Sequence, residues 1–236
     1  MNLISISDLH GRNVWQQLDP AAYDRIVFLG DYVDSYVESD ETIYNNLKAL
    51  IAFKRKYPRK VVLLLGNHDA HYLHFPHYRC SGFRDAAQPA LSTLFTRYAG
   101  LFQIAHQEGR YLFTHAGVTS AWLARLLTQT NRELDGADLT PKFDLAGLLN
   151  AVHQQPLRVR NVLFEVGPLR GGRDLYSGPV WADRSETRTN YLPHFHQIVG
   201  HTPTPDFLTV GNLGGSITYT DVLQTKTAFY ELYIRD

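Results

Sequence analysis

The sequence predicts an α/β fold with two β-sheets and helices on their outer faces. Three short apolar runs in the first third, Leu3–Ile6, Arg25–Leu29 and Lys60–Leu65, have the length and composition of buried strands. A segment with helical spacing separates the last two runs, so we expect right-handed crossovers and a parallel sheet there. Strand-like segments around glycine turns in the last third predict a second, mostly antiparallel sheet.

The helices are predicted from caps and apolar spacing. Ser39 or Asp40 can cap the first helix, and Pro58 closes it. Its apolar stripe consists of Ile43, Leu47, Leu50 and Ile51. Three further helices are expected from Pro89 to Gly100, from Ser120, and over Asp144–His153.

The remaining strands are predicted from turns. Phe102–Ala105 and Arg110–Thr114 surround Glu108-Gly109 and predict a hairpin. After Gly200 we expect three antiparallel strands around Gly214-Gly215, at Phe207–Val210, Ile217–Val222 and Thr227–Ile234.

Composition restricts the class of protein. The chain has 236 residues, of which 44% are hydrophobic and 19% charged, as in ordinary globular proteins with a proper core. No linker or low-complexity tract divides it, so we expect a single domain over residues 1–236. The formal net charge is zero, so no bulk basic field would recruit nucleic acid as a partner.

The sequence also suggests a compartment. The one cysteine, Cys80, excludes an internal disulfide framework and fits a reducing environment. Met1 leads directly into the first predicted strand, which leaves no room for a signal peptide. No apolar run approaches the ~18 residues of a membrane span. We therefore expect a cytoplasmic protein without a membrane partner.

Five apolar runs end in side chains that can bind metal ions. These groups are Asp8 with His10, Asp31 with Asp34, Asn67 with His68, His115, and His201. In open α/β sheets, ligands gather at the carboxyl ends of strands, so the five groups can meet. Carboxylates, imidazoles and one amide suit two divalent cations, whose remaining charge can bind phosphate and activate a water molecule. Each motif alone is weak, and the ordered combination predicts a dinuclear metal hydrolase.

These five groups resemble the signature of the calcineurin-like metallophosphoesterase superfamily. That signature runs Asp-x-His, Gly-Asp, Gly-Asn-His-Asp/Glu, His and Gly-His, and all five blocks occur here in order within residues 3 to 205. The resemblance implies a four-layer α/β/β/α sandwich of two mixed β-sheets flanked by helices. It also implies an enzyme, a metal-dependent phosphoesterase in which a metal-bridging hydroxide attacks phosphorus.

The resemblance also implies a role for each site residue. Carried over by position, the metal ligands are Asp8 and His10 on the first cation, Asp31 as the bridge, and Asn67, His115 and His201 on the second. His68 would protonate the leaving oxygen or stabilise the charge that develops there. Asp34 would orient His68 and raise the pKa of its imidazole. We expect two divalent ions, with Mn first and Fe, Zn or Co as alternatives.

Within the superfamily, the blocks are most similar to the serine/threonine phosphoprotein phosphatase and diadenosine tetraphosphatase branch. Trp181-Ala182-Asp183 resembles a Trp-Ser-Asp stretch of that branch, and Pro203 stands where many phosphodiesterases have a second metal-binding His. One departure concerns the branch's phosphate-binding arginine, because Ser35 occupies that position. The candidates to replace it are Arg12, Arg170, Arg173 and Arg184.

The histidine run His68, His71, His74 and His77 invites a second metal site, but spacing of three rotates round a helix and Pro76 breaks the run. We expect instead that His71 or His74 leans over the catalytic pocket.

The leading function is a phosphatase acting on phosphate monoesters, which could include phosphoserine or phosphothreonine. Its substrate would be a phosphorylated small molecule, a nucleotide or a phosphoprotein. Cleavage of a nucleotide polyphosphate such as diadenosine tetraphosphate is the alternative, motivated by Asp69 in place of Glu and by the missing arginine. A non-catalytic scaffold on the same fold is disfavoured because every matched ligand is present. Nucleic-acid processing is disfavoured by the neutral charge and by Pro203.

Overall fold

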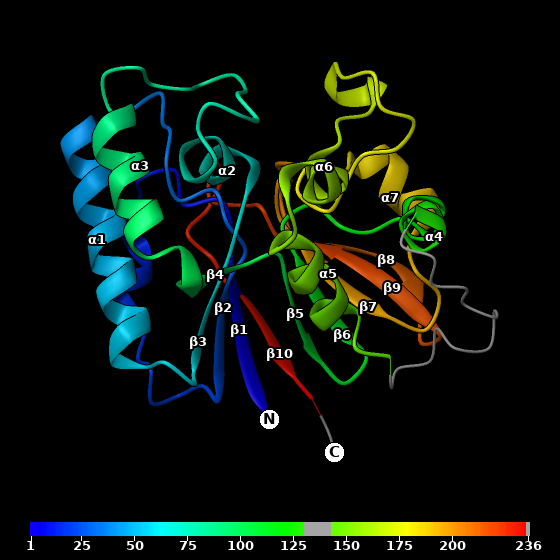
Figure 1. The fold of residues 1–236 in the computed structure, drawn as a ribbon. Coiled ribbons are helices and arrows are strands. Elements are labelled where there is room, and N and C mark those ends of the chain that lie inside the picture. The colour runs from blue at the N-terminus through cyan, green and yellow to red at the C-terminus, as the bar shows by residue number, and fades with distance from the viewer. Residues whose placement is uncertain (130–142, 235–236) are drawn as a thin grey trace.

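The computed structural model describes residues 1–129 and 143–234. Two five-stranded sheets pack face to face, with helices on both outer faces (Figure 1). Both sheets contain parallel and antiparallel pairs. The four-layer sandwich of two mixed sheets is therefore confirmed.

The first sheet has the strand order β10-β1-β2-β3-β4. Its strands are β1 (Asn2–Ile6), β2 (Arg25–Phe28), β3 (Val61–Leu64), β4 (Phe102–Gln103) and β10 (Tyr230–Tyr233). Strands β1 to β4 run parallel, and β10 is antiparallel to β1. The parallel sheet predicted for the first third of the chain is therefore present.

The second sheet has the order β5-β6-β7-β9-β8. Its strands are β5 (Ala105–Glu108), β6 (Tyr111–Thr114), β7 (His196–Val199), β8 (Leu208–Asn212) and β9 (Gly215–Tyr219). The pairs β6–β7 and β7–β9 are parallel, so the carboxyl ends of these three strands lie at one edge. The sheet is thus mixed, whereas the strand pattern alone predicted a mostly antiparallel one.

Helices cover the outer faces. The α-helices are α1 (Asp40–Lys56), α2 (Asn67–Leu73), α3 (Gln88–Arg97), α4 (Ser120–Gln129), α5 (Leu145–His153), α6 (Leu157–Arg160) and α7 (Arg184–Asn190). Short 3₁₀ turns occupy Val14–Gln17, Ala99–Leu101, Asn161–Phe164 and Pro168–Arg170. Helices α1 and α3 flank the first sheet, and α4 to α7 lie beside the second (Figure 1). Among the described residues, no helix is both long and apolar enough to cross a membrane.

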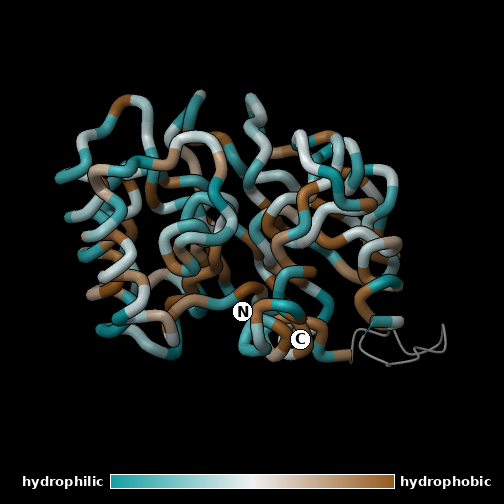
Figure 2. Tube along the Cα trace, turned by 45° about the horizontal axis from the view of Figure 1, so that its top comes forward, coloured by the Kyte–Doolittle hydropathy of each residue, from teal (hydrophilic) through white to brown (hydrophobic). Residues whose placement is uncertain are grey.

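The apolar runs are continuous because the strands are buried on both faces. On β2, Ile26 and Phe28 pack toward the helices, whereas Val27 packs between the sheets against Phe113 and Ile198. Hydrophobic segments accordingly lie mainly in the interior of the trace (Figure 2). The α1 stripe is buried as predicted, and Ser39 caps that helix.

Two strand predictions were wrong in detail. Residues 102–103 pair with β3 in the first sheet, so the hairpin partner of β6 is Ala105–Glu108. The last strand, β10, crosses to pair with β1 instead of joining β8 and β9. Both errors concern the choice of partner strand, which depends on contacts far apart in the sequence.

Candidate metal centre

Side chains that could hold a metal ion converge from both sheets at the carboxyl ends of the strands. The ligand atoms of Asp8, His10 and Asp31 lie within 4.8 Å of one another, and so do those of Asp31, His115 and His201. Asp31 belongs to both groups. The position expected to bridge two cations is therefore the one that the two ligand groups share.

His115 lies at the centre of the second group, with the other three side chains around its Nε2. Its Nδ1 donates to the carbonyl oxygen of Leu29 at 2.9 Å, which leaves a lone pair on Nε2. That Nε2 lies 3.0 Å from Asn67 Oδ1, 3.1 Å from His201 Nδ1 and 3.5 Å from Asp31 Oδ2. His115 is fully buried. In the neutral ring, whose one proton is on Nδ1, Nε2 has no hydrogen to donate to the Asn67 and Asp31 oxygens. A cation could bind this nitrogen and both oxygens.

The first group has a similar arrangement. His10 Nδ1 lies 3.0 Å and 2.9 Å from the carbonyl oxygens of Val33 and Asp34, so it donates and leaves Nε2 free. That Nε2 is 3.8 Å from Asp31 Oδ2. Asp8 is buried and accepts the backbone N–H of His201 at 3.0 Å, a bond that joins the two sheets at the site. These donor atoms fit a divalent cation on each side of Asp31.

Glycines allow the loops to approach so closely. Gly30 has a φ of +103°, and a Cβ there would overlap the backbone of Gly66. A Cβ on Gly66 would in turn overlap Oδ1 of Asp31. The glycines that precede Asp31 and Asn67 are therefore steric requirements of the site.

The site residues themselves have unusual backbone conformations. Asp8, His10, Asp31, Asp34 and His201 all have positive φ, between 45° and 67°. This left-handed region is unfavourable for residues other than glycine, and such strain is concentrated at functional sites. The chain thus bends sharply after each strand and turns the side chains toward the centre.

His68 and Asp34 form a hydrogen-bonded pair beside the ligands. His68 Nδ1 lies 2.9 Å from Asp34 Oδ2, and the His68 backbone N–H donates to Asp31 Oδ1 at 3.0 Å. Burial lowers the pKa of His68, but the Asp31 charge and the Asp34 hydrogen bond outweigh burial and raise it well above the ordinary value. The imidazole is therefore suited to hold a proton.

Asp34 has more partners than the sequence suggested. Tyr72 donates to its Oδ1 at 2.6 Å, and His71 Nε2 lies 2.8 Å from its Oδ2. Burial raises the pKa of Asp34, and the hydrogen bonds from His68, His71 and Tyr72 more than offset this, so the pKa is lowered. Asp34 is held as a carboxylate in a fixed orientation. His71 thus contacts Asp34 from a fully buried position, whereas the sequence predicted that it could lean over the pocket.

Asp69 supports the loops and does not face the centre. Its Oδ2 accepts the backbone N–H groups of Asp31 at 2.7 Å and Gly66 at 3.0 Å, and its Oδ1 accepts that of Tyr32 at 2.9 Å. The side chain is completely buried. The presence of Asp instead of Glu at position 69 therefore affects the geometry of the loops. It is only a weak indicator of the substrate.

The four candidate arginines differ in position. Arg12 Nη1 donates to the Leu9 carbonyl at 3.2 Å, beside the first ligand group. Arg170 pairs with Asp183 at 2.9 Å and donates to Thr202 Oγ1, next to His201. Arg173 is exposed, and Arg184 is the first residue of α7. Only Arg12 and Arg170 are placed against site residues by these contacts.

Ser35 has a structural role. Its hydroxyl accepts the backbone N–H groups of Val37 at 3.2 Å and Glu38 at 3.1 Å. Arg84, which the sequence did not single out, donates to the carbonyls of Ser35 and Glu38 at 3.0 Å each. The segment after Asp34 is thus held by Arg84 from the loop preceding α3.

Asp221 is a buried carboxylate that sequence analysis missed. Tyr219 at the end of β9 pairs with Val199 at the end of β7, so Asp221 and His201 each lie two residues past paired strand ends. Asp221 is 2% exposed, and nothing in the described chain donates a hydrogen bond to its Oδ1. Burial and the Asp31 charge raise its pKa to about 7, and its own charge contributes to the raised pKa of Asp8.

His74 does not lean over the site, which corrects one alternative for the histidine run. Its Nε2 lies 2.9 Å from Nε2 of His153 on α5, and both rings contact Phe164. His77 is exposed. Burial and neighbouring positive charges, including Arg160, lower the pKa to about 3 for His74 and to about 4 for His153.

This pair should make the protein sensitive to acid. The unfolded chain binds protons at these histidines near pH 6.5 and the folded chain only below about pH 4, so stability should fall as the pH drops through that window. At pH 5 the loss should be about 2 kcal/mol for each histidine, or about 4 kcal/mol for the pair. Urea unfolding at pH 7.5 and pH 5 should show a smaller loss for His153→Gln than for wild type. His77→Gln serves as the exposed control, and an equal loss in all three proteins would contradict the prediction.

Comparison with known proteins identifies the family. The sequence model of calcineurin-like phosphoesterases matches residues 1–205. The chain belongs to this family. The family is metal-dependent, in agreement with the two ligand groups that share Asp31. The resemblance drawn from the five sequence blocks is therefore confirmed.

Two yeast relatives of this calcineurin-like phosphoesterase match a short segment. One is a Schizosaccharomyces pombe protein provisionally named a serine/threonine-protein phosphatase, 37% identical over 70 residues, which are 28% of this chain and 22% of the relative. The other, a PP2A-like serine/threonine-protein phosphatase of Saccharomyces cerevisiae, is also 37% identical over 70 residues, 28% of this chain and 18% of the relative. The matched segment thus spans about a fifth of each relative's length.

Solved structures share the fold. A cold-active protein-tyrosine phosphatase of a psychrophilic Shewanella superimposes with a TM-score of 0.57, at 18% identity, over 98% of this chain and 75% of that one. A point mutant of a cold-active protein tyrosine phosphatase gives 0.58 at 17% identity, over 98% of this chain and 74% of that one. At these identities the likeness concerns the fold alone.

Proposed function

We propose that this chain is a dinuclear metal-dependent phosphatase acting on phosphate monoesters. The observation that carries the proposal is that Asp31 belongs to both ligand groups. Asp8 and His10 would hold one cation, and Asn67, His115 and His201 the other. When bound, the two cations, Mn in the first instance, would supply an activated water and neutralise the charge of the phosphate.

Side chains beside the cations would donate the proton and bind the phosphate. Asp34 holds His68 through Nδ1, and the raised pKa of His68 supports its role as the acid that protonates the leaving oxygen. Ser35 caps a turn and cannot replace an arginine, so we assign phosphate binding to Arg12 or Arg170.

The direct test is hydrolysis of p-nitrophenyl phosphate by metal-reconstituted protein, with elemental analysis of the bound metal. Two equivalents of metal and turnover support the proposal. No stoichiometric metal and no turnover would instead support a non-catalytic scaffold. A phosphoserine peptide and diadenosine tetraphosphate, compared side by side, separate the monoesterase from the nucleotide polyphosphate hydrolase.

Asp221 gives a test that needs no turnover. We propose that its carboxylate, whose Oδ1 has no hydrogen-bond partner in the described chain, adds negative charge to the side of the site formed by Asp8. Asp221→Asn should raise the melting temperature of the metal-free protein, because a buried repulsion is removed, and weaken Mn²⁺ binding roughly tenfold. Calorimetry of both forms measures this.

The matched control for Asp221→Asn is Asp69→Asn. Asp69 accepts three backbone N–H groups, so its replacement should lower stability with and without metal. If Asp221→Asn behaved like Asp69→Asn, Asp221 would be a structural residue.

A further inference from the structure

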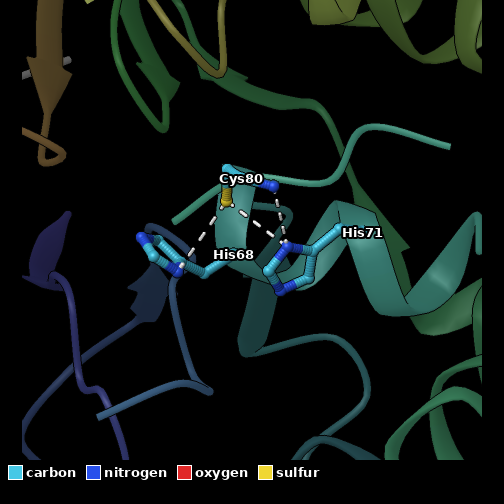
Figure 3. Close-up of side chains that lie close together, drawn as sticks. All are labelled: His68, His71 and Cys80. Carbon is cyan, nitrogen blue, oxygen red and sulfur yellow. Dashed lines mark hydrogen bonds between the residues drawn. The ribbon is translucent and has the colours of Figure 1, made fainter. Parts of the chain in front are cut away.

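A second cluster of metal-binding side chains lies beside the dinuclear centre. His68 and His71 project from α2, and Cys80 returns to them from the loop that follows this helix (Figure 3). Cys80 Sγ is 3.3 Å from His71 Nδ1 and 4.0 Å from His68 Nδ1. The three ligand atoms lie within 4.8 Å of one another. The four-histidine run thus contributes two histidines to a cluster that a cysteine completes.

These separations match a four-coordinate zinc ion. Zn–S bonds of about 2.3 Å and Zn–N bonds of about 2.0 Å put neighbouring ligand atoms in a tetrahedron roughly 3.5 Å apart. The distances of 3.3 Å and 4.0 Å from Cys80 Sγ lie on either side of this value, so small side-chain movements suffice. Three protein ligands leave a fourth position that solvent would fill.

The ligand atoms also have suitable electronic character. The backbone N–H of Cys80 approaches His71 Nδ1 at 3.4 Å, which leaves this nitrogen as an acceptor on the side of the sulfur. A thiolate with two imidazoles selects a soft or borderline ion, whereas the dinuclear site offers only oxygen and nitrogen ligands.

We propose that His68, His71 and Cys80 form an inhibitory zinc-binding site, distinct from the two catalytic metal positions. The consequence for activity rests on the proposed role of His68. With Nδ1 bound to zinc, His68 would lose its hydrogen bond to Asp34, the contact that orients the imidazole. The enzyme would keep both catalytic cations, and His68 would no longer be held in position to act on the leaving oxygen.

Cobalt provides a spectroscopic test that is independent of activity. Cys80 is the one cysteine of the chain, so a thiolate-to-cobalt charge-transfer band in the near ultraviolet can arise only from this site. Titration of the full chain with Co²⁺ should produce this band in wild type and in Asp31→Asn, which retains all three ligands. Cys80→Ser and Cys80→Ala should lack it, and His71→Asn should weaken it. His77→Asn is the control for an exposed histidine of the same run and should retain it.

Inhibition is measured separately. Zinc added to the manganese-loaded enzyme should inhibit p-nitrophenyl phosphate hydrolysis at a concentration at least tenfold lower for wild type than for Cys80→Ser, each relative to its own uninhibited rate. No band in wild type, or a band that persists in Cys80→Ser, would overturn the site. A band with equal zinc sensitivity in both proteins would overturn the inhibitory role alone. Absence of any phosphatase activity would refute the proposed function and leave the cobalt result intact.

Discussion

Replacing Asp31 by asparagine should abolish activity and metal binding together. Asparagine keeps the shape and can still accept the His68 backbone N–H through Oδ1. It loses the negative charge that the two ligand groups share, and its Nδ2 hydrogens would point toward Nε2 of His10 and His115. We expect turnover to fall at least roughly 10³-fold, a loss of about 4 kcal/mol of transition-state stabilisation. Turnover of p-nitrophenyl phosphate and bound metal are the two measurements.

The matched control is Asp85→Asn. The Asp85 side chain is 80% exposed and pairs with Arg79, so this variant should keep both properties. Wild-type metal content in Asp31→Asn would show that Asp31 does not bridge two cations.

His68→Asn should affect substrates according to their leaving groups. Nitrophenolate can leave as an anion, whereas the alkoxide of phosphoserine needs a proton as the ester bond breaks. If His68 supplies that proton, its loss should cost roughly 10³-fold on a phosphoserine peptide and about tenfold on p-nitrophenyl phosphate. The ratio of kcat/KM values for the two substrates measures the effect.

Asp34→Asn should shift the same ratio in the same direction by a smaller factor, because it removes the charge that supports the protonated His68. Equal losses on both substrates would indicate that His68 binds the phosphate and does not protonate the leaving group.

Much of the fold and the candidate site could be predicted because the relevant signals are local. Each ligand group follows a buried strand with a glycine nearby, and backbone sterics explain why Gly30 and Gly66 are glycines. The structure brings Asp31 together with candidate ligands from both sheets, as the order of the five blocks suggested. Their roles in catalysis remain predictions for the variants above to test.

The features that the sequence did not reveal depend on distant contacts. Strand β10 pairs with β1, from which it is separated by more than 220 residues of sequence. The composition of β10 alone does not predict which strand it pairs with. Cys80 reaches His71 through an irregular loop without periodicity. Asp221 falls inside the strand expected over Ile217–Val222, without a glycine or a second ligand beside it, so the sequence did not mark it as a strand-end side chain; β9 in fact ends at Tyr219.

The left-handed backbone at Asp8, His10, Asp31, Asp34 and His201 has a consequence for the protein's tolerance to mutation. At about 1 kcal/mol each, these conformations cost roughly 5 kcal/mol, comparable to the whole stability of many domains. Glycine at any of these positions would relieve the local strain and remove a functional side chain. A selection for thermal stability alone should therefore enrich inactive proteins, with their changes concentrated at the residues on which hydrolysis is proposed to depend.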